Sequence, residues 1–388
     1  LPSVRLPALP SLREIIRIYG LRAEKHLSQN FLLQPSSINS LVKCAGSLQD
    51  ACVLEVGPGP GSLTRAILRQ RPRHLVVVEL DRRFLPALQE LQVSAAELGV
   101  HMDIYRGDIL KMNTEDIFPV DAVYWPERWG SGVEKSETDS ERKDRPASAD
   151  STALTETSDS PTPRPPRIRI LGNLPFNIST PLLIKWLENI ATRRQLWKLG
   201  RVPMTLTFQK EICERLTADV WSEQRSRLSI MAQAYCEVKF LKEIPGSAFV
   251  PKPKVDAGVV RLRPLAQPLI SVPFPYVEKL VRHAFHFRQK FIVRCLETLF
   301  PPDRPDLVFQ LFKEAAVQPM KRPIQLSNLE FRDLCEVYAR ICQKNENVFQ
   351  YDYQSPSNLA SWHSRKKTQT EIMGHSLTAD AVRKELYR

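Results

Sequence analysis

The chain has 388 residues, of which 43% are hydrophobic and 25% are charged, a composition typical of a globular protein too long for one small core. Its formal charge of +12 and pI of about 9.4 favour a polyanionic partner. No run approaches the roughly 18 apolar residues that a membrane span requires, so we expect no membrane partner. The seven cysteines include no C-x-x-C pair, which argues against a zinc knuckle or a disulfide framework.

The N-terminal extension, residues 1–12, has the composition of a targeting segment. Residues 1–13 contain Arg5 and Arg13 and no acidic residue, which is compatible with a mitochondrial transit segment. Three prolines interrupt any amphipathic helix there. The first helix that we predict runs from Ser36 to Ala45.

Strands and helices then alternate. We predict strands at Ala51–Val56, His74–Glu79 and His101–Tyr105, with helices at Ser62–Arg69 and Arg82–Leu98 between them. This alternation is the pattern of a doubly wound, mostly parallel sheet. Ligands of such sheets bind beyond the carboxyl ends of the strands.

The alternation stops at an acidic segment, residues 121–166. This segment carries ten acidic and six basic residues, so the remainder of the chain has a charge of +16. It is rich in Ser, Thr and Pro and has almost no apolar periodicity. We therefore predict a disordered insertion.

After the insertion the sheet resumes. We predict strands at Arg167–Ile170, Pro203–Phe208, Val238–Glu243 and Gly258–Leu262, which brings the sheet to seven strands. Four helices follow, at Tyr276–Phe285, Phe291–Leu299, Leu307–Ala315 and Asn328–Cys342. We expect an α/β sheet domain at residues 13–272, a smaller all-α domain at 273–349 and a flexible tail at 350–388.

Three consecutive strand ends carry residues suited to a nucleotide. Gly57, Gly59 and Gly61 lie where the strand turns sharply into a helix. Because glycine has no Cβ, the backbone of this turn can approach a bound cofactor closely. Glu79 ends the second strand, where an acid can accept hydrogen bonds from ribose hydroxyls. Asp108 ends the third and can accept from an adenine amine. The cofactor at this point is either a nicotinamide dinucleotide or S-adenosylmethionine.

The fourth strand end, Asn173-Leu174-Pro175-Phe176, favours S-adenosylmethionine and a methyl transfer. The Asn173 side-chain oxygen and the Leu174 carbonyl can accept both hydrogens of an exocyclic amine. This localises the nitrogen lone pair toward the sulfonium methyl group. Pro175 makes the turn rigid, and Phe176 can stack on a flipped-out base. We predict a helix that starts near Ser179, and we find no metal-ligand or Ser-His-Asp pattern.

Four motifs together resemble the ribosomal RNA adenine dimethyltransferase family, and two further segments favour its mitochondrial branch. The motifs are Gln29–Leu32, Glu55–Thr64, Asn173–Pro181 and Phe249–Asp256, and the two segments are Trp186–Ile190 and Thr205–Glu211. The resemblance implies a class I methyltransferase that dimethylates two adjacent adenosines of small-subunit rRNA with S-adenosylmethionine. It also implies a mitochondrial matrix protein that acts as a monomer on the immature small subunit.

The resemblance assigns further residues to the site. It implies that Gln29 and Leu32 close over the cofactor and that Leu80 and Ile109 line the pocket beside Gly57, Glu79, Asp108 and Asn173. Phe249 is either a second aromatic wall for the target adenine or a core residue, and both interpretations stay open.

Basic residues concentrate in three groups, which we interpret as RNA-binding: Arg13, Arg17, Arg22 and Lys25; Arg193, Arg194, Lys198 and Arg201; and the segment Arg282–Arg294. Two alternative functions remain. One is a non-catalytic ribosome-assembly factor or a cofactor of the mitochondrial transcription machinery that retains the fold. The other is a nicotinamide-dependent enzyme, which would give Asn173 to Phe176 no role.

Overall fold

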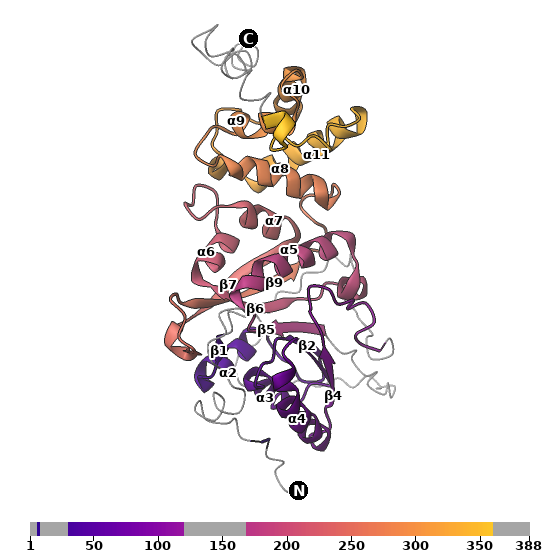
Figure 1. Ribbon diagram of the computed structural model, residues 1–388, viewed down its shortest axis with the longest axis vertical. Helices are drawn as coiled ribbons and strands as arrows, with labels where there is room; N and C mark the ends of the chain where they lie inside the picture. The colour runs from indigo at the N-terminus through magenta and orange to yellow at the C-terminus, as the bar shows by residue number, and fades with distance from the viewer. Residues whose placement is uncertain (1–5, 8–29, 120–167, 360–388) are drawn as a thin grey trace, which may run out of the picture.

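The computed structural model describes residues 6–7, 30–119 and 168–359, and its centre is a seven-stranded sheet (Figure 1). The strands are β2 (Cys52–Val56), β3 (His74–Glu79), β4 (His101–Arg106), β5 (Ile168–Gly172), β6 (Met204–Gln209), β7 (Cys236–Ile244) and β9 (Ala257–Pro264). Their order is β4-β3-β2-β5-β6-β9-β7, and the first five are parallel. Strand β9 runs antiparallel to both β6 and β7. The predicted fold class, a doubly wound and mostly parallel sheet, is confirmed.

Strands β2 and β3 are buried along their whole length, as expected of parallel strands covered on both faces. Alternate residues of each strand enter different hydrophobic clusters. Val53 and Val77 pack into the cluster that contains α2 (Pro35–Cys44), α3 (Ser62–Leu68) and α4 (Leu85–Glu97). Leu54 and Val76 pack into the other cluster, so the sheet separates two cores.

The second cluster extends from the sheet into the C-terminal helices. It includes residues of α5 (Phe176–Thr192), α6 (Lys210–Thr217), α7 (Arg227–Tyr235), α8 (Phe274–His286), α9 (Ile292–Leu296), α10 (Pro305–Ala315) and α11 (Asn328–Lys344). Figure 1 shows α8 to α11 stacked beyond α6 and α7, at the opposite end of the molecule from α3 and α4. The predicted helical region therefore continues a core that begins at the sheet.

Buried Arg225 also connects the two regions. Its guanidinium donates hydrogen bonds to the Ala218 carbonyl at 3.1 Å, the Leu326 carbonyl at 3.0 Å and Asn328 Oδ1 at 2.7 Å. Arg225 is 1% exposed, so its guanidinium has lost its hydrogen bonds to water. These three acceptors compensate for that loss. The start of α11 is thereby held against the loop that precedes α7.

The segment after α11 corrects one boundary. We predicted a flexible tail from residue 350, yet Tyr353 is 7% exposed and its ring lies edge-on to His283, with 5.4 Å between ring centroids. Lys279 Nζ donates to the Tyr351 carbonyl at 2.8 Å. Tyr351 and Tyr353 therefore pack on α8, the first through its backbone carbonyl and the second through its ring.

The remaining predictions about segments fall largely outside the described residues. These are the targeting segment at 1–12, apart from residues 6 and 7, the insertion at 121–166, and the tail from 360 onward. Within the described ranges, no helix has both the length and the apolar character needed to cross a membrane.

Candidate cofactor site and amine clamp

A cavity opens at the carboxyl ends of β2, β3 and β5, where a doubly wound sheet binds its ligand. Five segments contribute to it: the short strand β1 (Phe31–Leu32) with the preceding residue, the glycine-rich turn, the start of α3, the end of β3 and the turn after β5. The lining residues are Asn30, Phe31, Leu32, Gly57, Pro58, Gly59, Pro60, Ser62, Leu63, Glu79, Asn173 and Pro175.

The glycine-rich turn has a backbone that other residues adopt only under strain. Gly57, Gly59 and Gly61 have φ values of +67°, +54° and +81°. A Cβ at Gly59 would lie 3.1 Å from the Phe31 ring, and one at Gly61 would lie 2.6 Å from Leu91 Cδ1. Glycine here therefore serves both the turn itself and the close approach of β1 and α4 to it.

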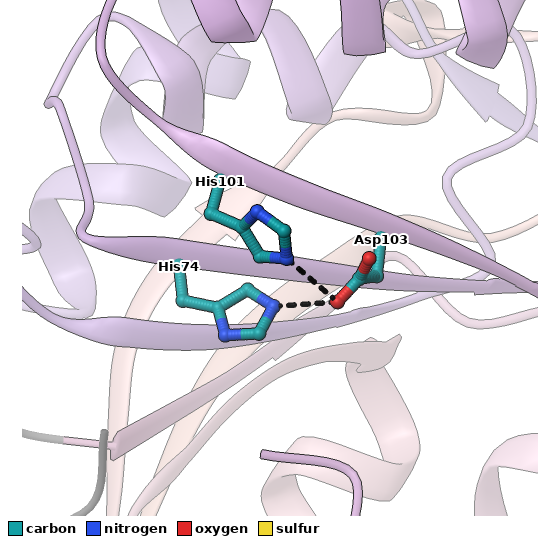
Figure 2. A group of neighbouring side chains, drawn as sticks. All are labelled: His74, His101 and Asp103. Carbon is teal, nitrogen blue, oxygen red and sulfur yellow. Dashed lines mark hydrogen bonds and ion pairs between the residues drawn. The ribbon is translucent and has the colours of Figure 1, made fainter. Parts of the chain in front are cut away.

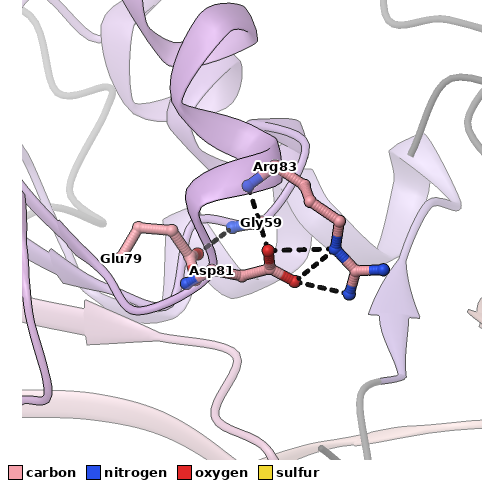
Figure 3. A network of polar contacts seen from close by, with 4 residues as sticks. All are labelled: Gly59, Glu79, Asp81 and Arg83. Carbon is pink, nitrogen blue, oxygen red and sulfur yellow. Dashed lines mark hydrogen bonds and ion pairs between the residues drawn. The ribbon is translucent and has the colours of Figure 1, made fainter. Parts of the chain in front are cut away.

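The Glu79 carboxylate is built into this turn (Figure 3). Its Oε2 accepts from the Gly59 amide at 2.9 Å and its Oε1 accepts from the Asp81 amide at 2.8 Å. Asp81 in turn forms an ion pair with Arg83 at 2.6 Å. Burial raises the pKa of Glu79, and the two backbone amides oppose the rise. The carboxylate is 4% exposed and retains lone pairs for a ligand in the cavity.

A second carboxyl group, Glu55, lies fully buried in β2 beneath the turn. Burial raises its pKa to about 8, and the nearby charge of Glu79 adds to the rise. The Thr64 hydroxyl opposes this shift, although its geometry falls short of a hydrogen bond, and neither Glu55 oxygen has a hydrogen-bond partner among the described residues. Glu55 is therefore mostly protonated at pH 7.

Asn173 is held in one orientation by two residues far from it in the sequence. Its Oδ1 accepts from the Thr207 hydroxyl at 2.7 Å, and its Nδ2 donates to the Asn30 carbonyl at 3.1 Å. Together these bonds assign the amide oxygen and nitrogen. One lone pair of Oδ1 is occupied by Thr207 and the second remains to accept from a ligand.

The helix after this turn begins earlier than predicted. We expected a start near Ser179, but α5 begins at Phe176 with Pro175 as its N-cap. The Pro175 carbonyl accepts from the amides of Ile178 and Ser179, at 3.1 and 3.2 Å. Proline fixes φ near the helical value and has no amide to satisfy, so it suits the start of a helix. Phe176 is therefore half-buried in the first turn of α5 rather than on a loop.

The structure brings only part of the predicted site to the cavity. Leu32, Gly57, Gly59, Glu79, Asn173 and Pro175 line it, whereas Gly61, Leu80, Asp108, Ile109, Leu174, Phe176 and Phe249 do not, and Gln29 lies outside the described residues. Asp108 Oδ1 accepts from the Leu110 amide at 3.0 Å, which shapes the turn after β4. Phe249 is 2% exposed and belongs to a core cluster, so of its two interpretations the structure describes core packing.

Among the residues that we did not predict, three polar ones line the cavity or orient Asn173. Thr207 and Asn30 orient Asn173, and Ser62 lines the cavity with a hydroxyl that has no hydrogen-bond partner in the described part of the chain. The signal for Thr207 was its position near the carboxyl end of a strand that neighbours β5. Asn30 contacts Asn173 through its backbone carbonyl, and because every residue has one, the sequence gives no signal for this contact.

The predicted basic group before β6 is not uniformly exposed. Arg201 is 7% exposed and its Nε donates to the Pro264 carbonyl at 2.8 Å, so it serves packing and does not belong to an RNA-facing surface. Lys198 Nζ forms an ion pair with Glu115 at 2.5 Å. Both residues were grouped with Arg193 because composition alone does not show that Arg201 is buried or that exposed Lys198 is paired with an acid.

Comparison with known proteins assigns the chain to a family. Residues 20–332 match the profile of the family described as ribosomal RNA adenine dimethylase. The chain belongs to this family. It is 45% identical over 354 residues to mitochondrial dimethyladenosine transferase 1 of Macaca fascicularis, covering 91% of this chain and 92% of that protein. Its identity to the Xenopus laevis protein of the same name is 44% over the same shares of each chain.

One solved structure supports the fold. The crystal structure of a dimethyladenosine transferase from Plasmodium falciparum has a TM-score of 0.53 and 20% identity, and the match covers 80% of this chain and 98% of that chain. Membership of the ribosomal RNA adenine dimethylase family confirms the predicted enzyme class and its cofactor, S-adenosylmethionine. It sets aside the nicotinamide alternative and does not favour a non-catalytic protein. Three features of the cavity fit this cofactor: a glycine turn that a nucleotide can approach closely, the buried carboxylate of Glu79, and the Ser62 hydroxyl, which has no partner among the described residues.

Proposed function

We propose that this protein transfers methyl groups from S-adenosylmethionine to the exocyclic amines of two adjacent adenosines in a small-subunit rRNA hairpin of the mitochondrion. The strongest support is the position of Asn173, which hydrogen bonds to Thr207 and to Asn30 hold at the wall of the cofactor cavity. The mitochondrial names of the relatives support this compartment, and we place the protein in the matrix on the immature small subunit.

In this proposal the cavity holds the cofactor through the residues of the turn and the strand ends. Glu79 accepts hydrogen bonds from the ribose hydroxyls. The adenine extends beyond the lined cavity to Asp108, whose carboxylate accepts from its amine. Leu32 packs against the cofactor from β1, while exposed Leu80 and buried Ile109 flank the adenine. The bound cofactor supplies an electrophilic methyl group on its sulfonium.

The amine clamp consists of Asn173 and Leu174. The second lone pair of Asn173 Oδ1 and the Leu174 carbonyl accept the two amine hydrogens, which localises the nitrogen lone pair. With the cofactor bound, its sulfonium would give up the methyl group to the amine nitrogen held by these two acceptors, and the nitrogen would then release a proton to water. Alignment of nucleophile and methyl group can supply about 7–11 kcal/mol. Because Thr207 and Asn30 fix Asn173 beforehand, this alignment costs little rearrangement.

Phe176 is the residue that we assign to stack on the target adenine. Its ring is half-exposed at the first position of α5, next to Pro175 in the cavity wall. Phe249 supports the site indirectly, because β8 (Phe249–Val250) pairs with β1 and Leu32 is its direct partner. Its buried ring holds the strand that lines the cavity.

We assign RNA binding to the helical region at 273–349. Phe287 and Phe291 are exposed large apolar residues, at 39% and 41%, and exposed Lys290 lies between them. Aromatic rings interleaved with cations bind single-stranded RNA by stacking and by phosphate contacts. Affinity for rRNA should therefore fall steeply as salt rises.

The test is methyl transfer from labelled S-adenosylmethionine to a hairpin RNA with two adjacent adenosines, repeated on immature small subunits. Asn173→Ala should abolish dimethyladenosine while leaving cofactor and RNA affinities within a few-fold of wild type. Asn189→Ala is the control and should retain activity, because Asn189 lies in the last turn of α5, the helix that follows the turn carrying Asn173. Dimethylation by Asn173→Ala at the wild-type rate would overturn the proposal.

A further inference from the structure

Three metal-ligating side chains meet at the opposite end of the sheet from the cofactor cavity (Figure 2). Asp103 Oδ2 lies 2.8 Å from His74 Nε2 and 3.3 Å from His101 Nε2. All three atoms lie within 4.8 Å of one another. His74 and His101 are the first residues of β3 and β4, whereas Glu79 at the cavity is the last residue of β3.

Backbone register produces this convergence. His74 and His101 are directly paired across the two parallel strands, and their rings are 4.5 Å apart between centroids. Asp103 is two residues after His101, so both side chains leave the same face of β4. Phe118 lies edge-on against the His74 ring, at 5.3 Å between centroids, and closes one side of the cluster. The three donors are thus held in place by the sheet itself.

The donor set and its spacing match a divalent transition ion. Two imidazoles and one carboxylate are ligands that Zn²⁺ accepts, with bonds of about 2.0–2.2 Å. In tetrahedral geometry, bonds of this length place ligand atoms roughly 3.3 Å apart. The observed separations of 2.8 and 3.3 Å therefore require only small side-chain movements. Both imidazoles now direct Nε2 at one oxygen, and an ion would replace the protons between them.

We propose that His74, His101 and Asp103 form a binding site for Zn²⁺ or a similar divalent transition ion. The His101 side chain is 67% exposed and that of Asp103 is 35% exposed, so water reaches the cluster and completes the coordination. His74 is 4% exposed and anchors the ion to the core. The ion ties edge strand β4 to β3 and takes no part in methyl transfer, because it lies at the amino ends of the strands.

The experiment is Zn²⁺ titration of the full chain without a polyhistidine tag, followed calorimetrically, with Co²⁺ as a spectroscopic probe. Wild-type protein should bind one ion with the spectrum of a tetrahedral nitrogen and oxygen site. Zinc-edge X-ray absorption should show imidazole ligands at about 2.0–2.1 Å and no sulfur. Added Zn²⁺ should also raise the unfolding temperature.

His101→Ala and Asp103→Asn should each weaken Zn²⁺ binding at least tenfold and remove its effect on the unfolding temperature. His286→Ala is the matched control, because His286 is also an exposed histidine but lies on α8. Loss of binding in His101→Ala but not in His286→Ala would support the site. Unchanged affinity in His101→Ala, a sulfur ligand, or no stoichiometric binding by wild type would overturn it. Circular dichroism confirms that each variant is folded.

Discussion

The two ends of β3 carry ionisable residues that burial affects in opposite directions. Burial lowers the pKa of His74 at the amino end and raises the pKa of Glu79 at the carboxyl end, so both neutral forms are favoured. His74 finds its partner, Asp103, on the neighbouring strand. Glu79 instead accepts from the amides of Gly59 and Asp81, which belong to loops.

The difference shows how a parallel sheet makes two kinds of site. At the amino edge, strand register alone brings side chains together, and the result is a cluster of side chains on neighbouring strands. At the carboxyl edge, loops turn back over the strand ends and present backbone amides and carbonyls. Asn173, placed between Thr207 and the Asn30 carbonyl, is the clearest case. We assign the cofactor and the reacting amine to the second kind of site, because loops can fold over a bound ligand.

The largest effect expected at the carboxyl edge is on stability, through Glu55. Its pKa of about 8 lies above that of an unfolded glutamate, so the folded state binds the proton more tightly. Stability should therefore fall as pH rises from about 4.5 to about 8, by on the order of 5 kcal/mol for this group. Glu55→Gln cannot ionise, so its free energy of unfolding should fall less over this range.

The measurement is urea unfolding of both proteins without cofactor at pH 5.5, 7 and 8.5. The amide that Glu55→Gln introduces is also buried without partners, so the variant should be less stable than wild type at low pH. The difference in free energy of unfolding between the two proteins should narrow or reverse at high pH. Exposed Glu90→Gln is the control and should follow the wild-type curve. Parallel curves for Glu55→Gln and wild type would show that Glu55 is not buried as a neutral acid.

The strands and the residues at their ends could be predicted from the sequence, but the hydrogen-bond partners at the carboxyl edge could not. The strand His74–Glu79 was predicted to the residue, because an unbroken apolar run between turns fits a buried parallel strand. The glycine-rich turn and Glu79 followed from their place at strand ends. Asn173 was predicted as a hydrogen-bond acceptor, but its partners were not, because Thr207 and Asn30 lie 34 and 143 residues away.

Where two local signals compete, sequence reasoning fails at a boundary. Pro181 lies inside α5 and serine is a common N-cap residue, so the local sequence favours a start near Ser179. Pro175 prevails because its carbonyl already accepts from the amides of Ile178 and Ser179. Phe249 remained undecided from sequence because an aromatic residue beside prolines suits both a ligand wall and a core, and burial depends on the whole fold.

The next effect tests whether Glu79 serves the cofactor or only the turn. In Glu79→Gln, an amide NH₂ would face the amide of Gly59 or Asp81, and the charged acceptor for ribose hydroxyls is lost. We expect the dissociation constant for S-adenosylmethionine to rise about 10- to 100-fold, equivalent to about 1.5–3 kcal/mol. Calorimetric titration measures it.

The pH dependence of that affinity adds a second test of Glu79. Because its pKa is raised, wild-type affinity should weaken as pH falls through this elevated pKa, whereas Glu79→Gln should show a flatter profile. Glu90→Gln again serves as the control and should bind the cofactor as wild type does. If Glu79→Gln binds normally at pH 8, the turn amides alone hold the cofactor and the proposed role of the carboxylate is wrong.

The smallest effect expected is also the most specific, because it separates orientation from contact. Thr207→Val removes the hydroxyl that donates to Asn173 Oδ1 at 2.7 Å and keeps the shape of the side chain. Losing one such bond costs about 0.5–1.5 kcal/mol, so we expect kcat to fall roughly 2- to 10-fold with cofactor affinity unchanged. Thr205→Val makes the same change two residues earlier in β6 and is the matched control. Equal kcat values for the two variants would mean that Asn173 keeps its position without Thr207. The clamp would then depend on the Asn30 carbonyl and on the loop that carries it.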